Sequence, residues 1–154
     1  MSAFRATLLV ACFLATRAVA ADLVQLDPFA QATGGDPACP AVAPPLMTVE
    51  QAGTQAHARA ERGTRCAMEG TCEAGGAYRR DPEINAAVRA AIAGDARFAD
   101  TSVWLTTSRR WVTLQGCVRS DAQRRALLAL AAHQPRVEKV FDELQVGVRA
   151  RRKQ

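Results

Sequence analysis

The chain has 154 residues, which leaves room for about one domain plus a tail or linker. Its formal net charge is +5, or +3 without Arg5 and Arg17 of a predicted leader, and an excess this mild does not by itself indicate a nucleic-acid-binding protein. Ala, Pro and Gly dominate the first half, whereas Val, Leu, Ile and both Trp residues gather in the second, so the hydrophobic core is predicted to be C-terminal.

Residues 1–20 have the pattern of a secretory signal peptide. Arg5 supplies the positive start, and the apolar run at 8–15 has signal length but is too short for a stable transmembrane helix. Ala18 and Ala20 then place small side chains at a cleavage site before Ala21. These features predict export to the periplasm of a bacterial envelope.

A second form of processing is also compatible with this segment. The run LVAC at 9–12 resembles a lipobox, in which Cys12 would be lipidated and become the mature N-terminus. The apolar stretch before Cys12 is very short for that role. We therefore favour cleavage and keep lipidation at Cys12 as the alternative, because an acyl chain would by itself attach the protein to a membrane.

Residues 21–46 are predicted to form an irregular linker, because Gly and Pro repeatedly break any period. Residues 47–80 are predicted to hold a helix followed by a loop rich in Cys and Gly. Thr48 and Gln51 have the spacing of a capping box, and alanines recur every four residues after them. Such a helix buries little apolar area, so it is expected to need a partner surface, either the C-terminal domain or a membrane.

Four cysteines remain after removal of the leader, and an even number in an exported chain suggests disulfides. Four cysteines allow three pairings. We favour Cys66 with Cys72, which are close in sequence across a flexible stretch, and this leaves Cys39 to pair with Cys117. Free thiols in a tail are the alternative.

A helix is predicted to begin at residue 81. The run DPE at 81–83 offers Asp81 as the N-cap and a proline at the first helical position. Ile84, Val88 and Ile92 then form one apolar stripe before the chain turns at Gly94.

Two strands are predicted to follow, at 101–108 and 111–119, because apolar and polar residues alternate in both. The arginines at 109–110 have low propensity for a tight turn, so the hairpin loop is expected to include Ser108 as well. Gly116 suggests a bulge or a close contact with a packed helix.

The remaining elements are a second helix and a last strand. Ser120 and Gln123 have capping-box spacing, Pro135 stops the helix, and the strand is predicted at 137–148, followed by a basic tail at 149–154. The order helix, strand, strand, helix, strand predicts an α+β fold: a two-layer sandwich in which two helices cover one face of a three-stranded sheet.

Residues 81–148 resemble a BON domain, named for bacterial osmotically inducible periplasmic and nodulation proteins. The similarity lies in DPEI at 81–84, WVTLQGCV at 111–118 and VEKVFDELQV at 137–146. The chain departs from the family at Trp111 and at Arg136, since glycine is common at both positions, and it contains one such domain where many members have two. The resemblance implies a binding module of the periplasm or outer membrane with no catalytic activity, a role in envelope stress or maintenance, and phospholipid headgroups as the usual ligand.

The basic and aromatic residues of this segment are the candidate lipid-binding site. Cations near an anionic surface contribute ~1 kcal/mol each, and Trp favours the membrane interface. The candidates are Arg109, Arg110, Trp111, Arg124, Arg125, Arg149, Arg151, Arg152 and Lys153. The alternative is that these arginines are ordinary solvated charges and that Trp104 and Trp111 serve packing.

No motif in the sequence indicates catalysis, a cofactor or a metal. A Gly-rich phosphate loop, a Ser-His-Asp signature, a Cys-x-x-Cys pair and zinc-ligand spacing are all missing from the sequence, and His57 and His133 have no motif partners. We therefore expect a non-enzymatic protein whose partner is an anionic membrane surface. The alternative is an adaptor that binds an envelope protein through the sheet face or an edge strand. Nucleic acid is not expected as a partner of an exported protein.

Overall fold

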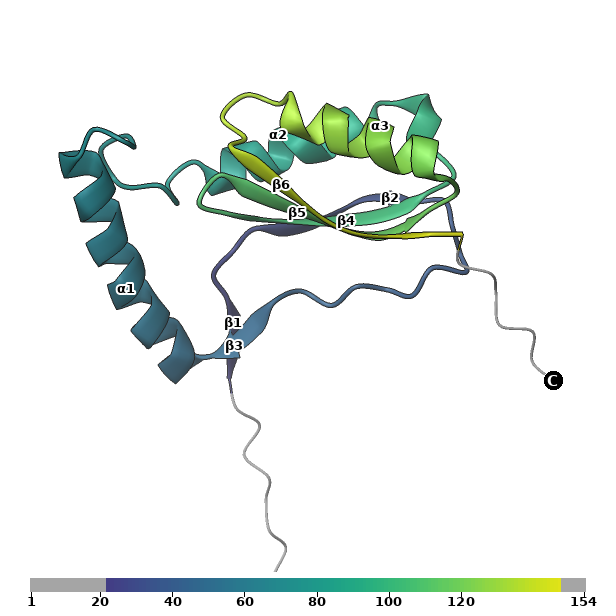
Figure 1. Ribbon diagram of the computed structural model, residues 1–154. Coiled ribbons are helices and arrows are strands. Elements are labelled where there is room, and N and C mark those ends of the chain that lie inside the picture. The colour runs from purple at the N-terminus through teal and green to yellow at the C-terminus, as the bar shows by residue number, and fades with distance from the viewer. Residues whose placement is uncertain (1–21, 148–154) are drawn as a thin grey trace, which may run out of the picture.

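The computed structural model describes residues 22–147 (Figure 1). The predicted leader at 1–20 with Cys12, and the basic tail at 149–154, lie outside these residues. Within the described part of the chain, no helix is both long enough and apolar enough to cross a membrane.

The C-terminal half contains the predicted helices and strands in the predicted order. They are α2 (Asp81–Ala93), β4 (Ser102–Ser108), β5 (Trp111–Val118), α3 (Asp121–Ala132) and β6 (Lys139–Val146), and a short 3-10 helix that was not predicted, η1 (Ala96–Phe98), follows α2. β4 and β5 form an antiparallel hairpin, and α3 connects β5 to β6, which runs parallel to it. A parallel pair needs such a crossover connection.

The main sheet has four strands where three were predicted. β2 (Phe29–Gly34) pairs antiparallel with β4 and gives the order β2-β4-β5-β6. The extra strand comes from residues 21–46, so the prediction of an irregular linker is wrong there. Ala30 and Ala32 of β2 pack against the core, and Asn85 of α2 donates from Nδ2 to the Pro28 carbonyl at 3.0 Å. The strand therefore depends on tertiary contacts more than on its own β-propensity.

Helices α2 and α3 lie side by side on one face of this sheet (Figure 1). Apolar residues with strand or helix periodicity meet between the two layers, as the amphipathic pattern predicts. Ile84, Val88, Ile92, Phe98, Val103, Leu105, Val112, Leu114, Val118, Leu127, Ala131 and Leu144 form the buried core. The fold is thus α+β, with an apolar layer between helices and sheet.

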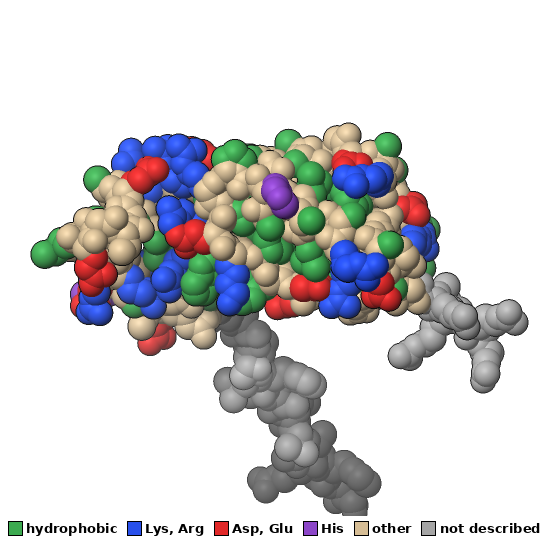
Figure 2. Space-filling model, turned by 45° about the horizontal axis from the view of Figure 1, so that its top comes forward, with side chains coloured by type: hydrophobic (Ala, Val, Ile, Leu, Met, Phe, Trp, Pro, Cys, Tyr) green, Lys and Arg blue, Asp and Glu red, His purple; other side chains and the backbone are tan. Residues whose placement is uncertain are grey.

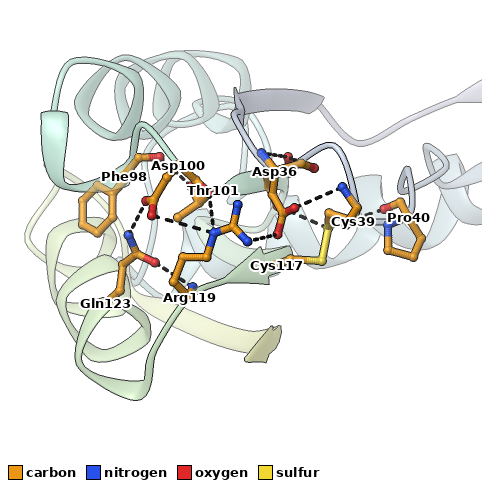
Figure 3. Close-up of polar contacts among 11 residues, drawn as sticks. Asp36, Cys39, Pro40, Phe98, Asp100, Thr101, Cys117, Arg119 and Gln123 are labelled. Atoms are coloured by element: carbon orange, nitrogen blue, oxygen red, sulfur yellow. Dashed lines mark hydrogen bonds and ion pairs between the residues drawn. A yellow bond between two sulfur atoms is a disulfide. The ribbon is translucent and has the colours of Figure 1, made fainter. Parts of the chain in front are cut away.

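The opposite face of the sheet is crossed by residues 35–45, here called the strap (Figure 1). The Cys39–Cys117 disulfide links the strap to β5. Figure 3 shows the Arg119 guanidinium between two carboxylates, with Nη1 at 3.3 Å from Asp36 Oδ2 and Nε at 3.7 Å from Asp100 Oδ2. Covalent and ionic contacts thus fasten the strap at the Cys117 end of β5.

Trp104 and Gly116 lie next to each other on neighbouring strands. Gly116 has φ +114°, and a Cβ there would clash with the Ser102 carbonyl and approach the Trp104 ring to 3.1 Å. The glycine therefore allows close contact with β4, where a bulge or a helix contact was predicted. Trp104 is only 8% exposed, so it packs inside the molecule and is not available at a membrane interface.

The segment after the strap forms a small sheet and a long helix. β1 (Leu23–Gln25) pairs with β3 (Leu46–Thr48), and α1 (Val49–Met68) follows directly. The capping box predicted at α1 is present: Thr48 Oγ1 accepts from Gln51 N at 3.2 Å, and Gln51 Oε1 accepts from Thr48 N at 3.0 Å. The Cys66–Cys72 disulfide closes the loop after α1, so both favoured cysteine pairings are present.

Candidate functional site

The turn between β4 and β5 consists of Arg109 and Arg110 alone, because Ser108 is paired with Trp111. The prediction that Ser108 belongs to the loop is therefore wrong. Arg109 has φ 57° and Arg110 has φ 65°. Both values lie in the left-handed region, which suits a two-residue hairpin turn but is unfavourable for arginine.

The carboxylate of Asp81 accepts hydrogen bonds from both residues of this turn. Its Oδ2 accepts from Arg109 N at 2.8 Å and its Oδ1 accepts from Arg110 N at 2.7 Å. Asp81 is 2% exposed, and this burial raises the pKa of its carboxyl group, although the two hydrogen bonds act in the opposite direction. Asp81 was predicted to be the N-cap of α2, but Arg80 occupies that position. The carboxylate serves the hairpin instead.

Two aromatic side chains lie beside the turn on the strap face of the sheet. Trp111 is the second residue after Arg109, and it lies on the same face of β5 as Cys117 because side chains alternate along a strand. Phe141 of β6 pairs in register with Thr113, so it belongs to the same face. The Trp111 and Phe141 rings meet edge to face, with centroids 5.6 Å apart.

Two cations cover these rings. The Arg109 guanidinium lies 4.7 Å from the Trp111 centroid, and Lys139 Nζ lies 4.7 Å from the Phe141 centroid. The aromatic residues are half-buried, whereas both cations are exposed. Within residues 22–147, neither cation forms an ion pair with a carboxylate. We call these four residues, Arg109, Trp111, Lys139 and Phe141, the hairpin cluster.

The other predicted lipid-binding residues are placed elsewhere. Arg110 is half-buried and paired with Glu138, and Arg124 Nε lies 2.6 Å from Asp142 Oδ2. Arg125 is exposed on α3, in the helix layer. The described chain thus brings together only Arg109 and Trp111 from the predicted set. The candidates Arg149, Arg151, Arg152 and Lys153 lie outside the described residues.

Basic side chains do not form one continuous patch over the helix layer. Figure 2 shows them gathered at the α1 end of the molecule and again at the opposite end, with acidic side chains beside both groups. Ion pairs such as Arg124–Asp142 on this layer reduce the local positive charge. On the strap face near the turn, Arg109 and Lys139 lie over aromatic rings and form no ion pair within residues 22–147.

Lys139 and Phe141 were missed as site residues by sequence reasoning. Lys139 is exposed and Phe141 is half-buried, and both lie on a strand that was predicted from its core-facing apolar residues. Their contact with Trp111 depends on the parallel register of β5 and β6, which pairs Trp111 with Lys139. The alternation around Val140 was the one available signal, because it places Lys139 and Phe141 on the same face.

Comparison with known proteins identifies the C-terminal half. Residues 80–148 match the family model described as the BON domain. No curated protein and no solved structure matches the chain. The matched residues include the whole hairpin cluster, but they exclude the strap and α1.

Proposed function

The chain is a BON-domain protein, with that domain at residues 80–148, and on this premise we propose that it is a non-enzymatic protein of the bacterial envelope that binds phospholipid headgroups. We assign the binding to the hairpin cluster. Membership of a family of typically periplasmic binding proteins supports the location, as does the secretory pattern of residues 1–20.

One observation carries the proposal: two cations that form no ion pair within the described residues lie over two half-buried aromatic rings at an exposed edge of the sheet. Anionic headgroups attract Arg and Lys, and the amphipathic Trp ring prefers the depth at which headgroups lie. The cluster offers both interactions within a few ångströms. No nucleophile is paired with a general base in it, so the same geometry gives no support to catalysis.

Flotation with vesicles tests the proposal. The full chain is expressed with its own leader, and the mass of the purified protein decides between cleavage before Ala21 and lipidation at Cys12. The cleaved form is mixed with phosphatidylcholine vesicles, with and without phosphatidylglycerol, at low and high salt. We expect binding to the anionic vesicles only, and weaker binding at high salt because exposed charges are screened.

The hairpin cluster is tested by Arg109→Ala/Lys139→Ala. At ~1 kcal/mol for each cation, the double variant should bind anionic vesicles about 30-fold more weakly. Arg89→Ala removes an exposed charge from α2 and serves as the control that should bind like the wild type. Equal binding by the double variant and the control would exclude the cluster as the headgroup site.

A protein partner is the second candidate, and the sheet edge favours it. β6 is one of the two edge strands of the main sheet, and its Val146 is 39% exposed. An edge strand presents unpaired backbone groups that another chain can extend. Absence of vesicle binding under all salt conditions would overturn the headgroup proposal and leave this edge as the site to test.

A further inference from the structure

We infer that the protein has a second binding site, a hollow between the C-terminal end of α1 and the hairpin turn that holds a phosphoryl oxyanion. The hollow has a volume of about 190 Å³ and is lined by Arg62, Arg65 and Arg109 among others. This site extends beyond the proposed function, because α1 lies outside the BON domain and the ligand need not belong to a membrane.

The wall formed by α1 is fixed by a close backbone contact. A Cβ on Gly63 would lie 3.2 Å from the Gly76 Cα, so the helix and the loop at residues 74–76 approach each other where both lack a side chain. Gly76 also has φ +86°, which glycine adopts at no steric cost. Any larger residue at either position would push α1 away from the loop.

Arg59 and Tyr78 secure the same contact from the side. Arg59 donates two hydrogen bonds to the Asp27 carboxylate, at 2.7 and 2.9 Å, and these two side chains are each only 16% exposed. The Arg59 guanidinium lies 4.6 Å from the Tyr78 centroid, and Arg62 lies 5.9 Å from it. Tyr78 thus links α1 to the start of the BON domain and orients Arg62.

The three arginines of the hollow have no carboxylate partner within residues 22–147. Cys66 O, near the end of α1, accepts from Thr71 N at 2.9 Å and from Cys72 N at 3.2 Å, so the loop backbone and not an arginine occupies this carbonyl. Glu69 also lines the hollow and reduces its charge. Three guanidinium groups and one carboxylate leave a net positive charge that suits a phosphate.

The chemistry and the size of the hollow point to the same class of ligand. A guanidinium group matches the geometry of phosphate oxygens and binds them with two parallel hydrogen bonds. Since water occupies about 30 Å³ per molecule in the liquid, the hollow has room for a phosphoryl group and a few waters. The phosphate can belong to a soluble molecule or to a lipid headgroup that reaches the hollow beside the hairpin cluster.

Titration of the full chain with inorganic phosphate at constant ionic strength, followed by NMR of backbone amides, tests the hollow. We expect saturable shifts at residues 62–71 and at the hairpin turn. Arg62→Ala/Arg65→Ala should bind phosphate at least about tenfold more weakly, because it loses two charge-assisted contacts. Arg89→Ala/Arg125→Ala removes two exposed charges outside the hollow and is the charge-matched control, and Arg62→Lys/Arg65→Lys should bind with intermediate affinity. A non-saturable response, or one that is equal in Arg62→Ala/Arg65→Ala and the control, would overturn the inference.

Vesicles then identify the source of the phosphate. If phosphatidic acid vesicles compete with inorganic phosphate, the hollow binds a headgroup, and if phosphate binding persists unchanged, it binds a soluble phosphate; both results support the site. Lys139→Ala separates the two proposals, because Lys139 belongs to the hairpin cluster but does not line the hollow, so the variant should weaken vesicle binding while phosphate titration stays as in the wild type. Loss of phosphate binding in this variant, with unchanged circular dichroism, would show that the hollow is not a separate site.

Discussion

The two halves of the described chain are held in place by different forces. Residues 80–147 enclose a continuous apolar core between two helices and a sheet. Residues 22–79, here called the arm, contribute Ala52 as their one buried hydrophobic residue. The arm is attached instead by the Cys39–Cys117 disulfide, the Asp36–Arg119 ion pair and the backbone pairing of β2 with β4.

This difference shows that apolar burial and directional contacts make separate contributions to the structure of one chain. Burial of apolar area is non-directional and tolerates small shifts. Ion pairs, disulfides and close backbone contacts fix orientation but bury little area. The contacts of the arm therefore fix the position of α1, which a site formed jointly by α1 and the hairpin turn needs. Burial in the BON domain contributes most of the free energy of folding.

The largest expected effect is the loss of the strap disulfide. Cys39 and Cys117 are 78 residues apart in sequence, so Cys39→Ser/Cys117→Ser should lower the free energy of unfolding by up to about 4.5 kcal/mol in the chain-entropy model. Cys66 and Cys72 are only 6 residues apart, and their replacement should cost about 2 kcal/mol. Urea denaturation measures both variants. A larger loss for the short loop would contradict the account of the arm as a tethered segment.

A core substitution should cost nearly as much without any covalent change. Leu114 is fully buried in the BON domain, and Leu114→Ala should lower the free energy of unfolding by about 3 kcal/mol through lost burial and a remaining cavity. Met68 of the arm is 83% exposed, so Met68→Ala should change it by less than about 0.5 kcal/mol. Thermal unfolding followed by circular dichroism measures the contrast, and similar losses for the two variants would refute the difference between the halves.

Removal of the carboxylate under the hairpin should have a smaller effect. Asp81→Ala leaves Arg109 N and Arg110 N without their acceptor, and we expect a loss of about 2 kcal/mol. The altered turn should also shift the fluorescence of Trp111, because the Arg109 guanidinium would no longer be held over its ring. Asp121→Ala removes an exposed carboxylate from α3 and is the matched control. An unchanged emission spectrum in the Asp81 variant would show that the turn keeps its shape without this residue.

The smallest expected effect is a pH dependence from the same carboxylate. Burial raises the pKa of Asp81 above the ordinary aspartate value, so in the acid range the native state keeps a proton that the unfolded state has lost. The stability of the wild type relative to Asp81→Asn should therefore be greatest below about pH 3.9 and should fall as the pH rises through the native pKa. Urea denaturation of both proteins across the acid to neutral range measures this difference. A difference that grows with pH would mean that the two backbone hydrogen bonds outweigh burial.

The sequence predicts the elements of residues 81–146 because their apolar residues repeat with clear helix or strand periods. The spacing of Cys66 and Cys72 and that of Thr48 and Gln51 likewise depend on short-range geometry, which a sequence displays directly. The Cys39–Cys117 pair followed only because these two cysteines were left over. The strand β2 could not be predicted in this way. Its inward residues, Ala30 and Ala32, are small, and the strand exists because β4 offers an edge and α2 offers Asn85.

The candidate site was predictable only in part, for a similar reason. Arg109 and Trp111 are neighbours in sequence, but Lys139 and Phe141 reach them through a parallel strand register. Asp142 of β6 pairs with Arg124, and Glu138, directly before β6, pairs with Arg110. Pairing between β5 and β6, which α3 separates in the chain, cannot be read from local sequence spacing. The prediction from charge alone therefore included Arg110 and Arg124, although both form ion pairs.

The edge position of β2 has a consequence for folding kinetics. Thr33 Oγ1 of β2 accepts from Val103 N across a sequence separation of 70, whereas a two-residue turn joins β4 to β5. Closing a long loop costs more entropy than closing a short one, so the hairpin and its two helices should assemble before β2 docks. During that interval the outer edge of β4 is bare and can pair with another chain. The time that β2 takes to pair with β4 therefore sets how long a newly made molecule can aggregate through this edge.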